Sequence, residues 1–70
     1  MEIKEIHSFQ VIDELLCGNK VMAVDRLEDE TLDLSEFSIF EISEILDNDE
    51  KNKDRYLFYY HAQQEIHKNV

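Results

Sequence analysis

The stretch LEDETLDLSEFSIFEISEILDNDE, residues 27–50, decides the fold and the character of the chain. It holds ten Asp and Glu residues and no Lys or Arg. Leucine, isoleucine and phenylalanine recur between the acids, so the stretch can fold and still project a negative electrostatic field. Ser38 and Glu41, three residues apart, form a capping box, and apolar residues follow at helical spacing. We therefore predict an amphipathic helix over residues 38–47.

Two short runs before this helix have the pattern of strands. Residues 21–24, VMAV, are rich in β-branched side chains, and residues 31–34 place Leu32 and Leu34 on one face. The polar residues 26–30 separate the two runs and favour a turn. This turn lacks Asn-Gly and Asp-Gly, so the predicted hairpin has a loop of several residues.

The N-terminal third contains a second predicted helix, over residues 9–17. Ser8 is placed as its N-cap, apolar residues recur at helical spacing, and Gly18 follows where a left-handed C-cap residue belongs. Residues 1–7 fit a short strand, a lead-in without regular structure, or an extra turn of helix. The sequence leaves these three alternatives open.

The C-terminal part begins with residues 47–54, DNDEKNKD, which are all polar and are predicted to form a solvated loop. Residues 55–61, RYLFYYH, are the most aromatic run of the chain, and this composition favours a strand. Residues 62–70 show little periodicity and are expected to fray or to form a short helix.

These elements predict a single α+β domain over residues 1–70 with the order helix, strand, strand, helix, strand. Two helices are expected on one face of a three-stranded sheet, and the last strand returns by a right-handed crossover. The uncovered face must then leave part of the aromatic strand half exposed, as either Tyr56, Phe58 and Tyr60 or Leu57 and Tyr59.

The charge balance restricts the class of partner. The 70 residues carry 17 Asp and Glu against 7 Lys and Arg, a formal net charge of −10. Direct binding to nucleic acid is disfavoured, because such affinity comes mainly from cationic side chains that neutralise phosphates. A basic protein is the favoured partner, including one whose groove holds DNA or RNA.

The location that we expect is the cytoplasm. The single cysteine, Cys17, cannot form an internal disulfide, and the first twenty residues lack the pattern of a secretory signal. No apolar run approaches the ~20 residues that span a bilayer, so no membrane contact is expected.

Motifs for catalysis, cofactors and metals are missing from the sequence. His7, Cys17, His61 and His67 do not stand at zinc-ligand spacings. A calcium loop beginning at Asp47 would need a glycine where the chain has asparagine. With one glycine there is no phosphate-binding loop, and so short a chain has little room for a water-excluding pocket. We expect no enzyme, no cofactor and no metal site.

Two limited resemblances bear on function. Residues 9–21, FQVIDELLCGNKV, resemble the helix, glycine, lysine and valine start of many small phage and prophage proteins, and are similar to the start of the anti-Thoeris family that sequesters signalling nucleotides. Residues 25–27, DRL, stand where that family has a tryptophan-containing motif. Size and charge also resemble phage-encoded anti-restriction and anti-CRISPR inhibitors. This second resemblance implies inhibition by imitation of nucleic acid.

The leading hypothesis is a phage or mobile-element protein that presents carboxylates to the basic groove of a nucleic-acid-handling protein and inhibits it. The acidic contacts predicted for this surface are Glu28, Asp29, Glu30, Asp33, Glu36, Glu41, Glu44 and Asp47, with Tyr56, Tyr59 and Tyr60 as aromatic anchors. One alternative is an assembly module, including a homodimer, that pairs through the aromatic strand while the acids only confer solubility. A second alternative is a small-molecule sponge that binds nucleotides.

Overall fold

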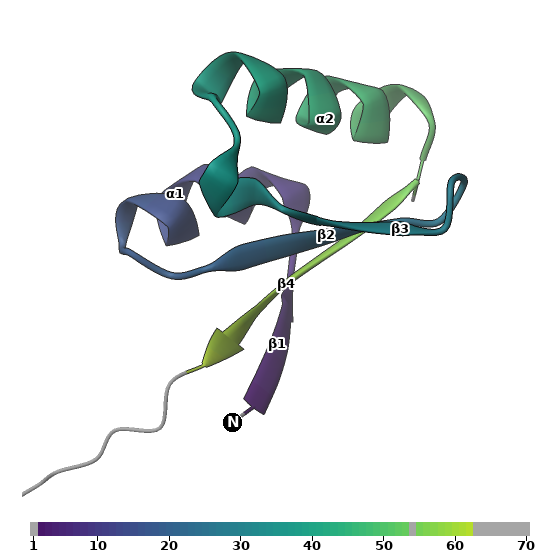
Figure 1. Cartoon of the computed structure of the whole chain (residues 1–70). Coiled ribbons are helices and arrows are strands. Elements are labelled where there is room, and N and C mark those ends of the chain that lie inside the picture. Colours follow the sequence, from purple (N-terminus) through teal and green to yellow (C-terminus); the bar gives the residue numbers. More distant parts are fainter. Residues whose placement is uncertain (1, 54, 63–70) are drawn as a thin grey trace, which may run out of the picture.

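The computed structural model describes residues 2–53 and 55–62, which form a four-stranded sheet and two α-helices (Figure 1). Two short 3-10 helices, η1 and η2, precede the α-helices. In chain order the elements are β1 (Glu2–Ile6), η1 (Ser8–Gln10), α1 (Val11–Leu16), β2 (Val21–Asp25), β3 (Glu30–Asp33), η2 (Leu34–Glu36), α2 (Ile39–Lys51) and β4 (Tyr56–Ala62).

The sheet has the strand order β1-β4-β2-β3, and every neighbouring pair is antiparallel. Strand β4 therefore lies inside the sheet, between β1 and β2. Its Phe58 is opposite Ile6 of β1 on one side and Ala23 of β2 on the other. Since β1 and β2 both run antiparallel to β4, they are parallel to each other, and α1 connects them. In the same way α2 connects β3 to β4, with β2 between them.

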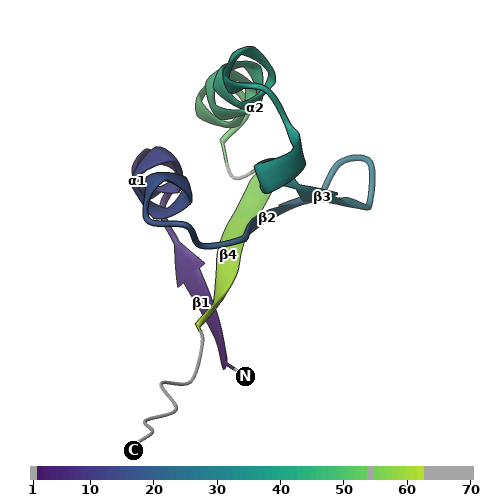
Figure 2. The same ribbon diagram turned by 60° about the vertical axis from the view of Figure 1, so that its left-hand side comes forward.

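Both α-helices lie on one side of the sheet, and the two views agree on this (Figures 1 and 2). The core forms between them and the facing side of the strands. Its buried hydrophobic residues come from every layer: Val11, Val21, Ala23, Leu34, Ile42, Ile45, Tyr56 and Phe58. In the described part of the chain, no helix is long and apolar enough to cross a membrane.

The α+β class with two helices is confirmed, but the predicted three-stranded sheet is wrong. Residues 2–6, which the sequence left open, form the edge strand β1. Ile6 packs against the core, whereas Ile3 points to the other face with most of its side chain exposed. With charged residues between these two isoleucines, the strand is recognisable only through its pairing with β4.

The first predicted helix is shorter than expected and begins differently. Ser8 is the first residue of η1 and not an N-cap. The backbone N–H of His7 donates to Oε1 of Gln10 at 2.9 Å, and the N–H of Gln10 donates back to the His7 carbonyl at 2.9 Å. The glutamine thus closes a 3-10 turn before α1 begins at Val11.

The predicted C-cap at Gly18 is confirmed. Gly18 has a φ of +89°, in the left-handed region. Its N–H donates to the Leu15 carbonyl at 3.0 Å, and the Asn19 N–H donates to the Glu14 carbonyl at 3.0 Å. This pair of bonds is a Schellman motif, which satisfies the last carbonyls of α1 and turns the chain into β2.

The helix α2 begins as predicted and ends later. The Ser38 hydroxyl accepts from the Glu41 N–H at 3.2 Å, and the Glu41 carboxylate accepts from the Ser38 N–H at 2.8 Å, so the capping box is confirmed. The predicted loop over residues 47–54 begins too early, because α2 continues to Lys51 and only residues 52–53 of the described part are outside it. An ion pair of 3.2 Å between Asp47 and Lys51, one helical turn apart, supports this polar end.

The predicted hairpin of β2 and β3 is confirmed, with a four-residue connection over residues 26–29. Within it Asp29 has a φ of +56°, so it belongs to the turn and not to β3. The predicted strand over residues 31–34 is shifted by one residue, because β3 spans Glu30–Asp33 and Leu34 begins η2.

Replacing Gly18 tests the importance of this turn. A Cβ added at Gly18 meets no atom within 4 Å, so the cost of Gly18→Ala arises from the positive φ alone. We expect the free energy of unfolding, measured by urea denaturation, to fall by about 1 kcal/mol. Gly18→Asn is the control and should lose less, because asparagine tolerates the left-handed region. Equal losses for the two variants would contradict this account.

Candidate functional site

The eight carboxylates predicted as partner contacts do not form a single row. Three of them have partners within the fold. Asp33 accepts from the Ser35 hydroxyl at 2.6 Å and lies 3.4 Å from Lys20. These contacts hold the pKa of Asp33 below its ordinary value, through the Ser35 hydrogen bonds first and Lys20 second. The other two are the capping-box residue Glu41 and Asp47, which pairs with Lys51.

The other five predicted carboxylates are exposed and lie on three parts of the chain. Glu28 and Asp29 are in the turn between β2 and β3, and Glu30 begins the edge strand β3. Glu36 is in η2, and Glu44 is on α2. Together these five form the group that we call the free carboxylates, since no hydrogen bond or ion pair of their side-chain oxygens is found among the described residues.

The three predicted tyrosine anchors are separated by the strand alternation of β4. Tyr56 and Tyr60 face the helices, and Tyr56 is only 8% exposed in the core. Burial raises the pKa of its phenol, with the nearby Asp25 adding to the effect. Tyr59 faces the opposite side, where no helix covers the sheet (Figure 2). Only Tyr59 and the half-buried Tyr60 are therefore placed for contact with a partner.

The sequence analysis did not single out Phe40, which is 81% exposed on α2. The helix buries Ile42 and Ile45, so Phe40 lies outside the buried stripe. Glu44 is one turn further along the same side. The exposure of Phe40 could have been predicted from the sequence, because its position does not match the helical spacing of the buried Ile42 and Ile45.

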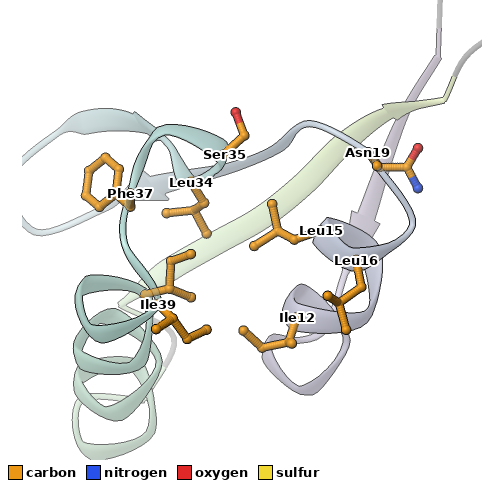
Figure 3. Close-up of a pocket in the computed structure, with 10 residues that line it drawn as sticks. Ile12, Leu15, Leu16, Asn19, Leu34, Ser35, Phe37 and Ile39 are labelled. Carbon is orange, nitrogen blue, oxygen red and sulfur yellow. The ribbon is translucent and has the colours of Figure 1, made fainter.

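An apolar groove runs between α1 and the segment formed by η2 and the start of α2 (Figure 3). Its volume is about 350 Å³. Leu16, at the end of α1, is 81% exposed, and Ile39, at the start of α2, is 55% exposed. The apolar residues that line the groove are Ile12, Leu15, Leu16, Leu34, Phe37, Ile39 and Ile42. Sequence reasoning missed this groove, because its two walls come from elements about twenty residues apart.

The uncovered side of the sheet is a second apolar surface, which we call the open face. The strand register places Met22 and Val24 of β2 opposite Tyr59 and Leu57 of β4 there. These side chains are half buried by their neighbours in the sheet. Of the two alternatives that the sequence left open for the half-exposed set, the structure has Leu57 and Tyr59 on the uncovered side.

A buried ion pair joins the ends of β2 and β4 on the helix-covered side. The carboxylate of Asp25, only 3% exposed, accepts from Nε of Arg55 at 3.1 Å and from its terminal nitrogen at 2.9 Å. The N–H groups of Leu27 and Glu28 also donate to it, at 3.0 and 3.2 Å. The Arg55 hydrogen bonds, followed by these backbone donors, lower the pKa of Asp25 against the opposing effect of burial. The sequence analysis predicted neither the pair nor the burial of Asp25.

A hollow of about 480 Å³ beside this ion pair is lined by Arg26, Leu27, Asn52, Lys53 and Arg55. Its cationic lining bears on the nucleotide-binding alternative. Arg55 already donates to Asp25 through Nε and one terminal nitrogen, so its charge is balanced within the fold. Among residues 2–53 and 55–62, no group of three or more His, Cys, Asp and Glu side chains is arranged to hold a metal ion.

Comparison with known proteins identified no relative of this chain. No protein-family model, no curated protein and no solved structure matches the chain.

The pH dependence of stability tests the Asp25–Arg55 pair. Because the folded-state pKa of Asp25 is lowered, the pair stabilises the fold above the ordinary carboxyl pKa of 3.8 and is lost as pH falls through the folded value. We expect Asp25→Asn to lower the melting temperature at pH 7 by about 10 °C. This difference from the unmodified chain should shrink as the pH is lowered toward 2.

The control for this experiment is Asp29→Asn, in the exposed turn, which removes the same charge and keeps a residue that tolerates positive φ. Its melting temperature should stay close to that of the unmodified chain across the same pH range. A deficit of Asp25→Asn that is unchanged at pH 2 would mean that the ion pair is not its cause.

Proposed function

We propose that this chain is a protein-binding inhibitor, encoded by a phage or mobile element and active in the cytoplasm. It presents carboxylates to the basic groove of a nucleic-acid-handling protein. The observation that carries the proposal is the exposure of all five free carboxylates on the turn, the start of β3, η2 and α2, with no ion pair at their side chains among the described residues. Such a surface attracts a positive groove over long range and speeds association.

The carboxylates of the acidic surface have two different roles in this proposal. Glu36 and Glu44 supply charge without supporting the fold, as do the carboxylates of the β2–β3 turn. Glu41 and Asp47 hold α2 in place through the capping box and the Lys51 pair. Their charges still add to the field, but replacing them would also weaken the helix.

Apolar anchors beside the carboxylates give the proposed surface more than charge. Phe40 is on the same helix as Glu44, and Ile39 opens onto the apolar groove next to η2, which carries Glu36. Aromatic and aliphatic anchors surrounded by polar contacts are typical of protein interfaces. Charge accounts for the attraction, and the apolar groups account for a defined orientation.

A competition experiment on immobilised DNA tests the proposal. Proteins from a bacterial lysate are bound to a DNA resin, and the purified chain is added at constant salt. We expect it to displace a distinct subset of these proteins, because carboxylates compete with phosphates for the same cationic groove. The double variant Glu36→Gln/Glu44→Gln should need about tenfold more protein for the same displacement.

The matched control is Glu5→Gln/Asp13→Asn, which removes two charges from β1 and α1, outside residues 27–50. It should displace the same proteins as the unmodified chain, apart from the small change expected from net charge. Displacement that falls equally for both double variants would reveal a general polyanion effect and would refute a defined binding surface. No displacement by the unmodified chain at low salt would refute the proposal altogether.

A further inference from the structure

Two hollows between residues 8–16 and α2 lie one after the other along that helix, and together we call them the interhelical trough. We propose that this trough is the docking site for a cationic amphipathic helix of the basic partner. The proposal rests on the inhibitor function proposed above, because it names the element by which that partner is held. The occupant has a stripe of apolar side chains, with Lys or Arg beside the stripe.

The walls of the trough expose large apolar side chains at both of its ends. The first hollow is the apolar groove between Leu16 of α1 and Ile39 of α2 (Figure 3). The second hollow, of about 570 Å³, has Phe9 of η1 on one wall and Leu46 of α2 on the other. Phe9 is 78% exposed, although its ring stacks on His7 with 5.2 Å between the centroids. Apolar side chains gathered on an exposed concave surface are typical of an interaction site.

The spacing of the two hollows along α2 selects a helix as the occupant. Ile39 lines the first hollow and Leu46 the second, and they are seven positions apart. This separation is two helical turns, or about 10 Å along the helix axis. A helix lying beside α2 presents side chains at positions i and i+7 with the same spacing, so one apolar anchor fits each hollow. An extended segment repeats the side chains of one face at ~6.6 or ~13 Å and does not match.

The charges at the trough select a cationic partner. Asp47 and Glu50 line the second hollow, and no Lys or Arg among the described residues lines either hollow. Asp47 pairs with Lys51, whereas the side chain of Glu50 forms no ion pair within the described part of the chain. A Lys or Arg beside the second anchor is attracted both by Glu50 and by the ring of Phe9. A second copy of this chain, with its 17 Asp and Glu, is disfavoured by the same carboxylates.

Binding of a synthetic peptide to the full chain tests the proposal. The probe is a labelled helix with leucine at positions i, i+3 and i+7 and with lysine and alanine elsewhere, titrated by fluorescence anisotropy at about 150 mM NaCl. We expect it to bind at least about tenfold more tightly than a scrambled peptide of the same composition, which has the same charge but no apolar stripe. The helix with glutamate in place of lysine should not bind, because the trough is itself negative.

Two variants of the chain test whether the peptide binds in the trough. Leu16→Ser removes an exposed apolar side chain from the first hollow, and Glu50→Gln removes the unpaired charge from the second. Each should weaken binding of the leucine–lysine helix about five- to tenfold. The matched controls are Leu27→Ser, at an exposed leucine of the β2–β3 turn, and Glu5→Gln, on β1. Both should bind the peptide like the unmodified chain.

Several outcomes would overturn the docking site. Equal binding of the helical and scrambled peptides would mean that charge alone explains the association, and equal binding of the glutamate helix would mean that apolar contact alone does. Losses in the two controls as large as those in Leu16→Ser and Glu50→Gln would place the peptide elsewhere on the chain. A dimer of the chain that Leu16→Ser dissociates would assign the trough to a second copy.

The peptide titration and the competition on DNA resin fail separately. If the leucine–lysine helix does not bind while the chain still displaces proteins from DNA, the docking site is refuted and the inhibitor function stands. If the helix binds as expected while the chain displaces nothing from DNA, the inhibitor function is refuted and the trough is supported as a site for cationic helices.

Discussion

The buried carboxylate of Asp25 is the constraint on which the geometry of this small domain depends. A charge in a thin core is costly unless its hydrogen-bonding positions are filled, and here the fork of Arg55 fills two of them. The turn amides of Leu27 and Glu28 donate two further hydrogen bonds, both to Oδ1. Because the Arg55 carbonyl also accepts the Arg26 N–H at 2.9 Å, one carboxylate fixes the turn after β2 and the start of β4 together.

The arrangement of layers gives the two sides of the molecule different chemistry. The β2–β3 turn, the start of β3, η2 and α2 carry the free carboxylates, whereas the open face of the sheet is nearly neutral.

The sequence predicted correctly those features that depend only on residues close to one another in the chain. The capping box of Ser38 and Glu41 and the left-handed turn at Gly18 are complete within a few residues, and both were predicted correctly. Strand β1 was not recognised, because its place depends on pairing with β4, more than fifty residues away. The Asp25–Arg55 pair spans thirty residues, and the walls of the groove meet only in the tertiary structure. The end of α2 was missed because a polar composition is common to loops and to exposed helix turns.

The position of β4 also determines when the domain can form during synthesis. The hairpin of β2 and β3 is local and can pair as soon as it leaves the ribosome, but β1, although made first, has its strand partner only once β4 has emerged. Most of the sheet therefore closes in one late step, when a strand is inserted between two others already made. Until then β1 and β2 each have an unpaired edge where β4 will bind. The many negative charges of the chain repel other copies that could pair with these edges.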